Sequence, residues 1–174
     1  AFPEGGYTSY ADLLLNAGKR YGVNPFILAS KLINEHGSDG DSGSVSGKVK
    51  GYEGYYNYFN IGAYAHSGKS AIENGLIYAK EHGWDSREKS IMAGTEFFAK
   101  DYIRSNKTTA YFQKFNVMNG ASAVARGQYM TAVWGANSTG VTLGRGYVSA
   151  YSSALTFEIP VYLNMPTLPV PYPR

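Results

Sequence analysis

The chain has 174 residues, which is the size of one compact domain. Hydrophobic residues make up 44% and charged residues 17%, so a disordered chain is excluded, and no apolar run reaches the roughly 18 residues of a transmembrane helix. The absence of cysteine excludes disulfide bonds and thiolate chemistry, and a net charge of +3 is too small for a dedicated nucleic-acid-binding protein.

Two helices are predicted near the N-terminus. Leucine and alanine recur at helical spacing over Tyr7–Tyr21, and Gly22 should end this helix. The second helix is expected over residues 25–36, with Asn24 as its N-cap, proline in its first turn and Gly37 directly after its end.

The middle of the chain is less regular. A long loop is predicted from Gly37 to Gly51, and a small hairpin is expected within residues 58–75. Asp85 and Glu88 have the spacing of a capping box. The remaining helices are expected over Leu76–His82, from Asp85 to near Arg104, over Thr109–Asn116, over Ser122–Trp134 and over Thr142–Ser153.

The last part of the chain, from Ile159 to Arg174, contains five prolines and is predicted to be an extended tail. The chain begins with Ala1 rather than methionine, which is typical of an excised or mature domain. We therefore expect residues 1–174 to form a single, mainly α domain that ends in this tail.

Glu35 is the most informative candidate for catalysis. On a wheel of about 100° per residue, Leu28 lies at 0°, Leu32 at about 40° and Glu35 at about −20°. The carboxyl group therefore lies on the buried side of its helix and in the last turn, where burial and the helix dipole both favour the protonated form. A protonated carboxyl group is the proton donor that glycosidic-bond cleavage requires, although hydrogen bonding at the edge of the core would explain the same position.

The segment from Tyr52 to Ala65 is rich in tyrosine and asparagine. Aromatic faces stack on sugar rings and amides bind hydroxyl or acetamide groups, so the segment could form a carbohydrate platform. Packing within the protein explains the same composition equally well. Residues 63–70 resemble a relaxed phosphate-binding loop, but no Val/Ile-rich strand precedes them, so nucleotide binding is not expected.

Metal binding is not expected either. The three histidines are His36, His66 and His82, and no two of them are four residues apart. Asp39 and Asp41 begin like a calcium loop, but the later ligands of such a loop are missing. We expect no cofactor and no metal.

Several segments together resemble the glucosaminidase domains of bacterial autolysins, glycoside hydrolase family 73, in their Gram-positive form. The resemblance extends over about residues 7–166. The segments that carry it are Ala29–Gly37, Tyr58–Ala63, Gly83–Trp84, Glu88–Lys89, Ala93–Gly94, Tyr111–Val117, Gln128–Thr131 and Phe157–Pro166.

This resemblance implies a mainly α, lysozyme-like fold with a small β-lobe beside a substrate groove. It places the catalytic acid at Glu35 and the active-site tyrosine at Tyr129. For a second carboxylate, Glu73 is the nearest candidate and Glu53 is an alternative. A third possibility is a substrate-assisted route without a second carboxylate. Sugar-binding residues are expected at Tyr58, Phe59, Asn60, Gln128 and Trp134.

The expected activity is that of an endo-β-N-acetylglucosaminidase, which hydrolyses the β-1,4 bond after N-acetylglucosamine in peptidoglycan. The expected partner is the glycan strand, with no nucleic acid and no membrane insertion, in a secreted bacterial protein that acts as a monomer in the cell wall. Two alternatives stay open: a lytic transglycosylase on the same fold, and a non-catalytic wall-binding module.

Overall fold

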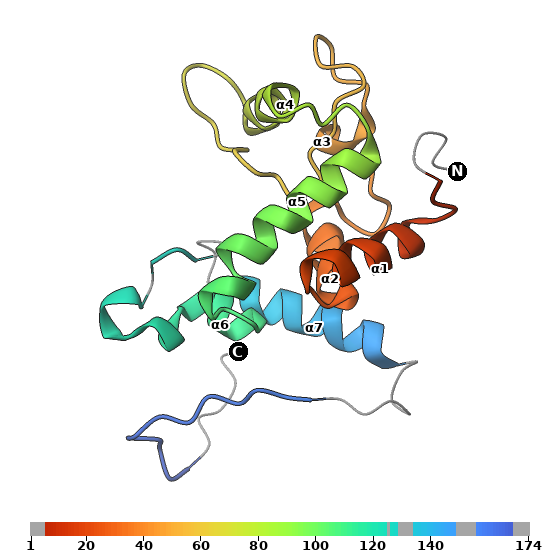
Figure 1. The fold of residues 1–174 in the computed structure, drawn as a ribbon. Coiled ribbons are helices and arrows are strands. Elements are labelled where there is room, and N and C mark those ends of the chain that lie inside the picture. The colour runs from red at the N-terminus through yellow and green to blue at the C-terminus, as the bar shows by residue number, and fades with distance from the viewer. Residues whose placement is uncertain (1–5, 125, 129–133, 149–155, 169–174) are drawn as a thin grey trace.

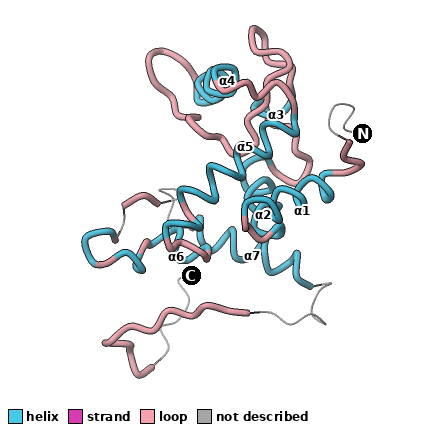
Figure 2. Tube along the Cα trace, viewed as in Figure 1, coloured by secondary structure: helices cyan, strands magenta, loops and turns pink. Residues whose placement is uncertain are grey.

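The computed structural model describes residues 6–124, 126–128, 134–148 and 156–168 (Figure 1). Within these residues the protein has seven α-helices and three 3-10 turns (Figure 2). The α-helices are α1 (Tyr10–Tyr21), α2 (Pro25–His36), α3 (Gly43–Ser46), α4 (Ala71–Glu81), α5 (Arg87–Asp101), α6 (Ala110–Phe115) and α7 (Gly135–Tyr147). The 3-10 turns are η1 (Ile103–Ser105), η2 (Val117–Asn119) and η3 (Ala121–Ala123). The expectation of a mainly α chain is confirmed.

Helices α1 and α2 follow the predicted pattern closely. The hydroxyl of Ser9 accepts a hydrogen bond from the backbone N–H of Asp12, and Gly22 ends α1 with a φ of 72°. Helix α2 begins with the Asn24 side chain accepting from the backbone N–H of Phe26 at 2.9 Å. It ends where Gly37 adopts a φ of 75°, a conformation that side chains disfavour.

Helices α4 and α5 begin differently from the prediction. Helix α4 begins at Ala71, before the predicted start at Leu76, because the side chains of Ser70 and Glu73 form a capping box. The N-cap of α5 is Ser86 and not Asp85, since the Ser86 hydroxyl accepts from the backbone N–H of Lys89. The predicted loop from Gly37 to Gly51 also contains one helical turn, α3.

Of the three helices predicted in the C-terminal part, the first is confirmed, the second is wrong over residues 124 and 126–128, and the third is confirmed for residues 142–147. Helix α6 lies within the predicted range. The helix predicted over Ser122–Trp134 is wrong for residues 124 and 126–128, because the Asn116 side chain donates to the backbone oxygens of Ala123 and Arg126 and holds them in an irregular loop. Helix α7 begins at Gly135, seven residues before the predicted start, and residues 149–153 lie outside the described part. Residues 156–168 contain no helix or strand.

The expected β-lobe is not a sheet. In the described ranges no strand occurs (Figure 2). The β-type backbone pairing within residues 58–75 is limited to an isolated antiparallel bridge between His66 and Lys69. Positive φ angles at Asn60, Ser67 and Gly62 interrupt any extended run there. The backbone groups of this segment are instead paired with side chains of neighbouring elements. The prediction of a hairpin is therefore wrong.

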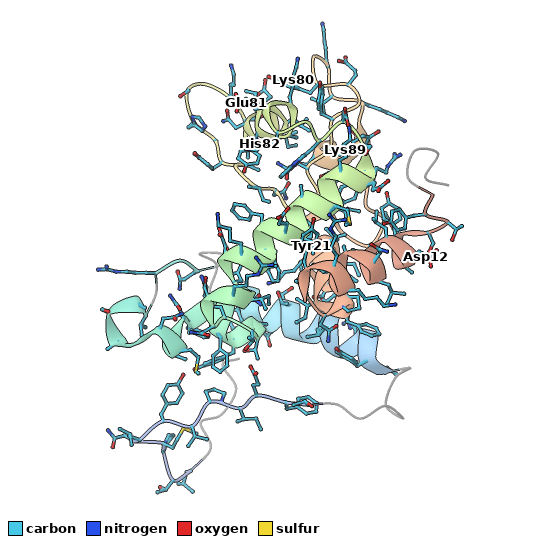
Figure 3. All side chains as sticks on the ribbon, viewed as in Figure 1. Asp12, Tyr21, Lys80, Glu81, His82 and Lys89 are labelled. Atoms are coloured by element: carbon cyan, nitrogen blue, oxygen red, sulfur yellow. The ribbon has the colours of Figure 1, made fainter. Side chains whose placement is uncertain are left out.

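Two parts of the molecule meet along α5. Helix α1 packs on α2 and α5, and α2 packs on α7. Residues 37–86, here named the cover segment, carry α3 and α4 and lie at the N-terminal end of α5 (Figure 1). In Figure 3, the labels Lys80, Glu81 and His82 mark this segment, and the label Tyr21 marks the end of α1. In the part of the chain that the structure describes, every helix is too short or too polar to cross a lipid bilayer.

Candidate active site

A cleft of about 540 Å³ lies between the end of α2, the cover segment and one side of α5. Its apolar lining is largely aromatic, and polar groups enter from α2, α3 and the loop before α4. The lining residues are Glu35, Ser42, Ser44, Phe59, Asn60, Ile61, Gly62, Ala63, Ala71, Ile72, Gly94, Phe97, Phe98 and Tyr102. A concave site with a few polar groups among apolar ones is the usual form of a ligand-binding site.

Glu35 enters this cleft from the last turn of α2 and is half-buried. The side-chain amide of Asn60 donates to its Oε2 at 2.9 Å. The other polar atom of that amide, Asn60 Oδ1, is buried and has no hydrogen-bond partner among the described residues. The amide thus holds the carboxylate on one side and keeps a free acceptor at the wall of the cleft.

His36, the next residue, fastens the cover segment to the end of α2. Its Nε2 lies 2.8 Å from the backbone oxygen of Tyr58, and its Nδ1 lies 2.7 Å from the hydroxyl of Ser42. Because a carbonyl oxygen can only accept, Nε2 carries the proton and Nδ1 accepts from Ser42. Burial lowers the pKa of His36, while the Tyr58 carbonyl and the Glu35 charge act in the opposite direction. The ring is therefore neutral and holds Ser42 and Tyr58 to the end of α2.

Asn57 shapes the turn that carries Asn60 to the carboxylate. Its side chain is fully buried, accepts from the backbone N–H of Ile61 at 3.0 Å and donates to the Ile61 and Gly75 oxygens at 2.8 Å each. Asn60 lies inside this turn with a φ of 49°. Sequence reasoning did not identify Asn57 or His36 as site-building residues, because their role depends on contacts far along the chain.

The floor of the cleft depends on the absence of a side chain at Gly94. A Cβ atom there would lie 2.2 Å from Cδ2 of Phe59, so only glycine allows the Phe59 ring to lie directly on α5. Phe59 is buried and forms part of the main hydrophobic core. One ring therefore links the packing of the core to the shape of the site.

Two further ionisable groups act on the cleft. Lys31, one turn before Glu35 on α2, is 2% exposed, and its Nζ lies 5.9 Å from the centre of the Phe98 ring. Burial lowers the pKa of Lys31 to about 8, against the attraction of Glu35. Tyr102 lines the cleft from the residue after α5, and burial together with the Asp101 and Glu35 charges raises its pKa. The sequence analysis did not propose either residue for the site.

The structure brings only part of the predicted set together. Phe59 and Asn60 lie in the cleft with Glu35. Tyr58 does not line the cleft: it is 6% exposed in the core, and its hydroxyl lies 2.6 Å from that of Tyr10. The sugar contact expected for Tyr58 stays a prediction, and in the structure its ring and its hydroxyl both lie against Tyr10 of α1.

The two candidates for a second carboxylate lie outside the cleft lining. Glu73 is exposed, and its Oε2 accepts from the backbone N–H and the hydroxyl of Ser70 at 2.8 and 2.7 Å. These hydrogen bonds lower the pKa of Glu73. Glu53 is also exposed and accepts from the backbone N–H of Gly51 at 3.0 Å. The catalytic role expected for Glu73 stays a prediction, and in the structure its carboxylate caps α4.

Two of the residues predicted near the C-terminal part, Gln128 and Trp134, do not line the cleft. Gln128 donates from its side chain to the backbone oxygen of Lys114 at 2.9 Å. Trp134 precedes α7 and is 59% exposed. Tyr129 lies outside the described residues, so its expected role stays a prediction.

Similar proteins are known. The bifunctional autolysin of Staphylococcus epidermidis is 32% identical over 153 residues, which are 84% of this chain and 11% of the relative. The crystal structure of glucosaminidase B of S. aureus is 31% identical with a TM-score of 0.57 over 78% of this chain and 52% of that chain. The chain is homologous to the glucosaminidase domains of staphylococcal autolysins.

A third relative of the family was solved with a ligand. It is a catalytic mutant of S. aureus Autolysin E, with a glutamate replaced by alanine, in complex with the disaccharide NAG-NAM. It is 28% identical with a TM-score of 0.65 over 80% of this chain and 60% of that chain. A search of protein-family models gave no match. The resemblance seen in the sequence is confirmed, although the chain spans only about a tenth of the autolysin it matches.

Proposed function

We propose that the protein is a peptidoglycan hydrolase that cleaves the β-1,4 bond after N-acetylglucosamine in glycan strands, with Glu35 as the proton donor. One observation carries the proposal: Glu35 is the one carboxyl group, among the described residues, that lines the cleft. The solved complex of a family member with NAG-NAM supports a substrate of this class.

The lining of the cleft is suited to sugar. Phe97, which is 36% exposed, presents aromatic surface on which the C–H face of a pyranose ring can stack, and the buried rings of Phe59 and Phe98 form the apolar wall behind it. The buried acceptor Asn60 Oδ1 is available to an N–H or O–H donor of a bound sugar. An N-acetyl group provides such an N–H next to the carbon that is attacked.

The placement of Glu73 and Glu53 outside the cleft lining favours a substrate-assisted reaction over one with two enzyme carboxylates. Glu35 gives its proton to the glycosidic oxygen as the bond from C1 to that oxygen breaks. The carbonyl oxygen of the N-acetyl group bonds to C1 and forms a cyclic oxazolinium ion. Water then attacks C1, the ring reopens, and the Glu35 carboxylate takes the proton from that water. Tyr129 is proposed to orient the acetamide, on the strength of the family resemblance alone.

The test compares Glu35→Gln with Glu73→Gln on purified cell wall. We expect Glu35→Gln to lower the rate of wall lysis by about 10²- to 10⁴-fold, the usual contribution of a general acid. Its thermal unfolding should stay close to that of wild type, because glutamine keeps the shape of the side chain. Glu73→Gln should keep the wild-type rate. Near-full activity of Glu35→Gln would refute the assignment.

Mass spectrometry of the released fragments decides among the functions. Reducing N-acetylglucosamine ends are expected. Anhydro-muramyl ends would instead identify a lytic transglycosylase, and wall binding without soluble fragments would identify a binding module. We propose that the protein acts as a monomer outside the cell, at the bacterial wall, where this substrate is found.

A further inference from the structure

Lys31 is the most unusual buried residue of the fold. Lysine is rarely buried, because its ammonium group loses hydration and its long side chain loses conformational freedom. Here the side chain is 2% exposed and lies against Phe98, in a position that methionine or leucine would fill with less cost. Packing therefore does not account for lysine at this position.

The position of Lys31 points to Glu35. The two residues are four apart on α2, so their side chains leave the same face one turn from each other. Their charges attract across the floor of the cleft, where Phe98 lines the cleft and also contacts the Lys31 side chain. A buried charge pair interacts more strongly than an exposed one, because little water screens it.

We propose that Lys31 is a positioning residue whose buried positive charge offsets the burial and the helix-end field at Glu35, so that the carboxyl group can alternate between proton donor and proton acceptor. This inference rests on the proposed function, in which Glu35 must be protonated in the first step and ionised in the second.

Among the described residues, the groups that face Glu35 from the neighbouring elements do not supply this charge. His36 is neutral because burial lowers its pKa, and Tyr102 at the end of α5 is a phenol that burial keeps protonated. Helix α7 faces this part of α2 with the hydroxyl groups of Thr139 and Thr142, which bond to Asn34. The buried residues of α1 are aliphatic or glycine.

The experiment uses Lys31→Met, which keeps the length of the side chain and removes the charge. We expect the basic limb of the pH profile of wall lysis to move to higher pH by about one unit, because the protonated acid is then favoured. We also expect kcat at neutral pH to fall several-fold with KM nearly unchanged, because the second step needs the carboxylate. The matched control is Lys19→Met, which removes an exposed charge from α1 and should leave both quantities unchanged.

A stability measurement shows that the variant folds and that the charge was buried. The pKa of Lys31 is about 8 in the folded protein and about 10.4 in the unfolded chain. The unfolded chain thus binds more protons between these values, so wild type gains stability as pH rises from 8 to 10.4. Relative to wild type, Lys31→Met should have a higher melting temperature at pH 7, and this advantage should shrink towards pH 10.4.

The outcomes separate this inference from the proposed function. If Glu35→Gln is inactive and Lys31→Met keeps the wild-type pH profile and kcat, Lys31 is only structural and the inference is wrong. If Glu35→Gln stays active, the proposed function fails first. If Lys31→Met shifts the profile and Lys31→Arg restores it, the charge and not the shape of the side chain is responsible.

Discussion

The C-terminal end of α2 and the N-terminal end of α4 each carry a glutamate, and the two ends treat it in opposite ways. Glu35 lies where the helix dipole disfavours an anion, half-buried beside Asn60. Glu73 lies where the dipole favours an anion, exposed and bonded to Ser70. The two helix ends thus give their carboxyl groups opposite surroundings.

This difference shows that position on a helix decides the role of an acidic residue. The capping carboxylate lowers the energy of α4, and its pKa is lowered by the hydrogen bonds that it accepts. The cleft carboxylate is held by the side-chain amide of Asn60, which belongs to the cover segment.

The largest effect is expected for Asn57→Ala. The change removes three hydrogen bonds from a fully buried side chain and leaves the Ile61 and Gly75 groups unsatisfied, which should cost about 3 kcal/mol of unfolding free energy. Wall lysis should fall as well, because the turn no longer holds Asn60 against Glu35. Urea denaturation and a lysis assay on the remaining folded protein measure the two effects.

Asn74→Ala is the matched control for that variant. Asn74 also donates from a buried side chain to backbone oxygens, those of Tyr64 and His66, but it serves the loop beside α4. We expect it to lose stability while the folded protein keeps its activity. Equal loss of activity in both variants would contradict the specific link from Asn57 to Glu35.

The second-largest loss of unfolding free energy is expected for Gly94→Ala. The added methyl group would overlap Phe59, so the ring must move into the cleft or α5 must shift, at a cost of about 1–3 kcal/mol. Gly140→Ala on α7 is the control, since a Cβ there meets no atom within 4 Å. The control should be slightly more stable than wild type, because alanine favours a helix. If Gly94→Ala has the same unfolding free energy as wild type, the residues at the floor of the cleft can shift at little cost.

The sequence predicted α2 and the position of Glu35 better than it predicted the surroundings of Glu35. Helix α2, its caps and the direction of Glu35 followed from local rules, because Asn24, Pro25 and Gly37 act within a few residues of themselves. The family resemblance was also correct, because it rested on many short segments in order. Nearby residues were enough to place the acid in the structure.

The surroundings of the acid could not be predicted in this way. Asn57, His36 and Gly94 each have at least one partner 18 to 35 residues away, and no periodic pattern marks such contacts. The tyrosine-rich segment was assigned to a hairpin, yet its asparagines and glycines turn the chain and its backbone groups bond to Ser44 and Ser90. Glu73 was proposed for catalysis by its order in the chain, although its spacing from Ser70 is that of a capping box.

A smaller effect is expected from pH acting on His36. Burial lowers the pKa of the folded ring, so the unfolded chain takes up a proton more readily below about pH 6.5. The unfolded state binds more protons there, and stability should therefore be present above that pH and be lost as pH falls. Melting temperatures between pH 5 and 8 measure this, and His36→Gln should flatten the acid side of the curve. An equally steep curve in His36→Gln would assign the effect to other groups.

The smallest effect is expected for Glu73→Gln, which alters the carboxylate at the N-terminal end of α4 and leaves Glu35 in the cleft unchanged. The amide keeps the shape of the capping box but loses the negative charge at the start of α4, so we expect a small loss of unfolding free energy. Because this carboxylate does not line the cleft, kcat and KM for wall lysis should be unchanged. Ser70→Ala removes the other half of the box and should cost a similar amount. If Glu73→Gln instead lowered kcat strongly at wild-type stability, the second step would need this carboxylate, and the substrate's acetamide would not be the nucleophile.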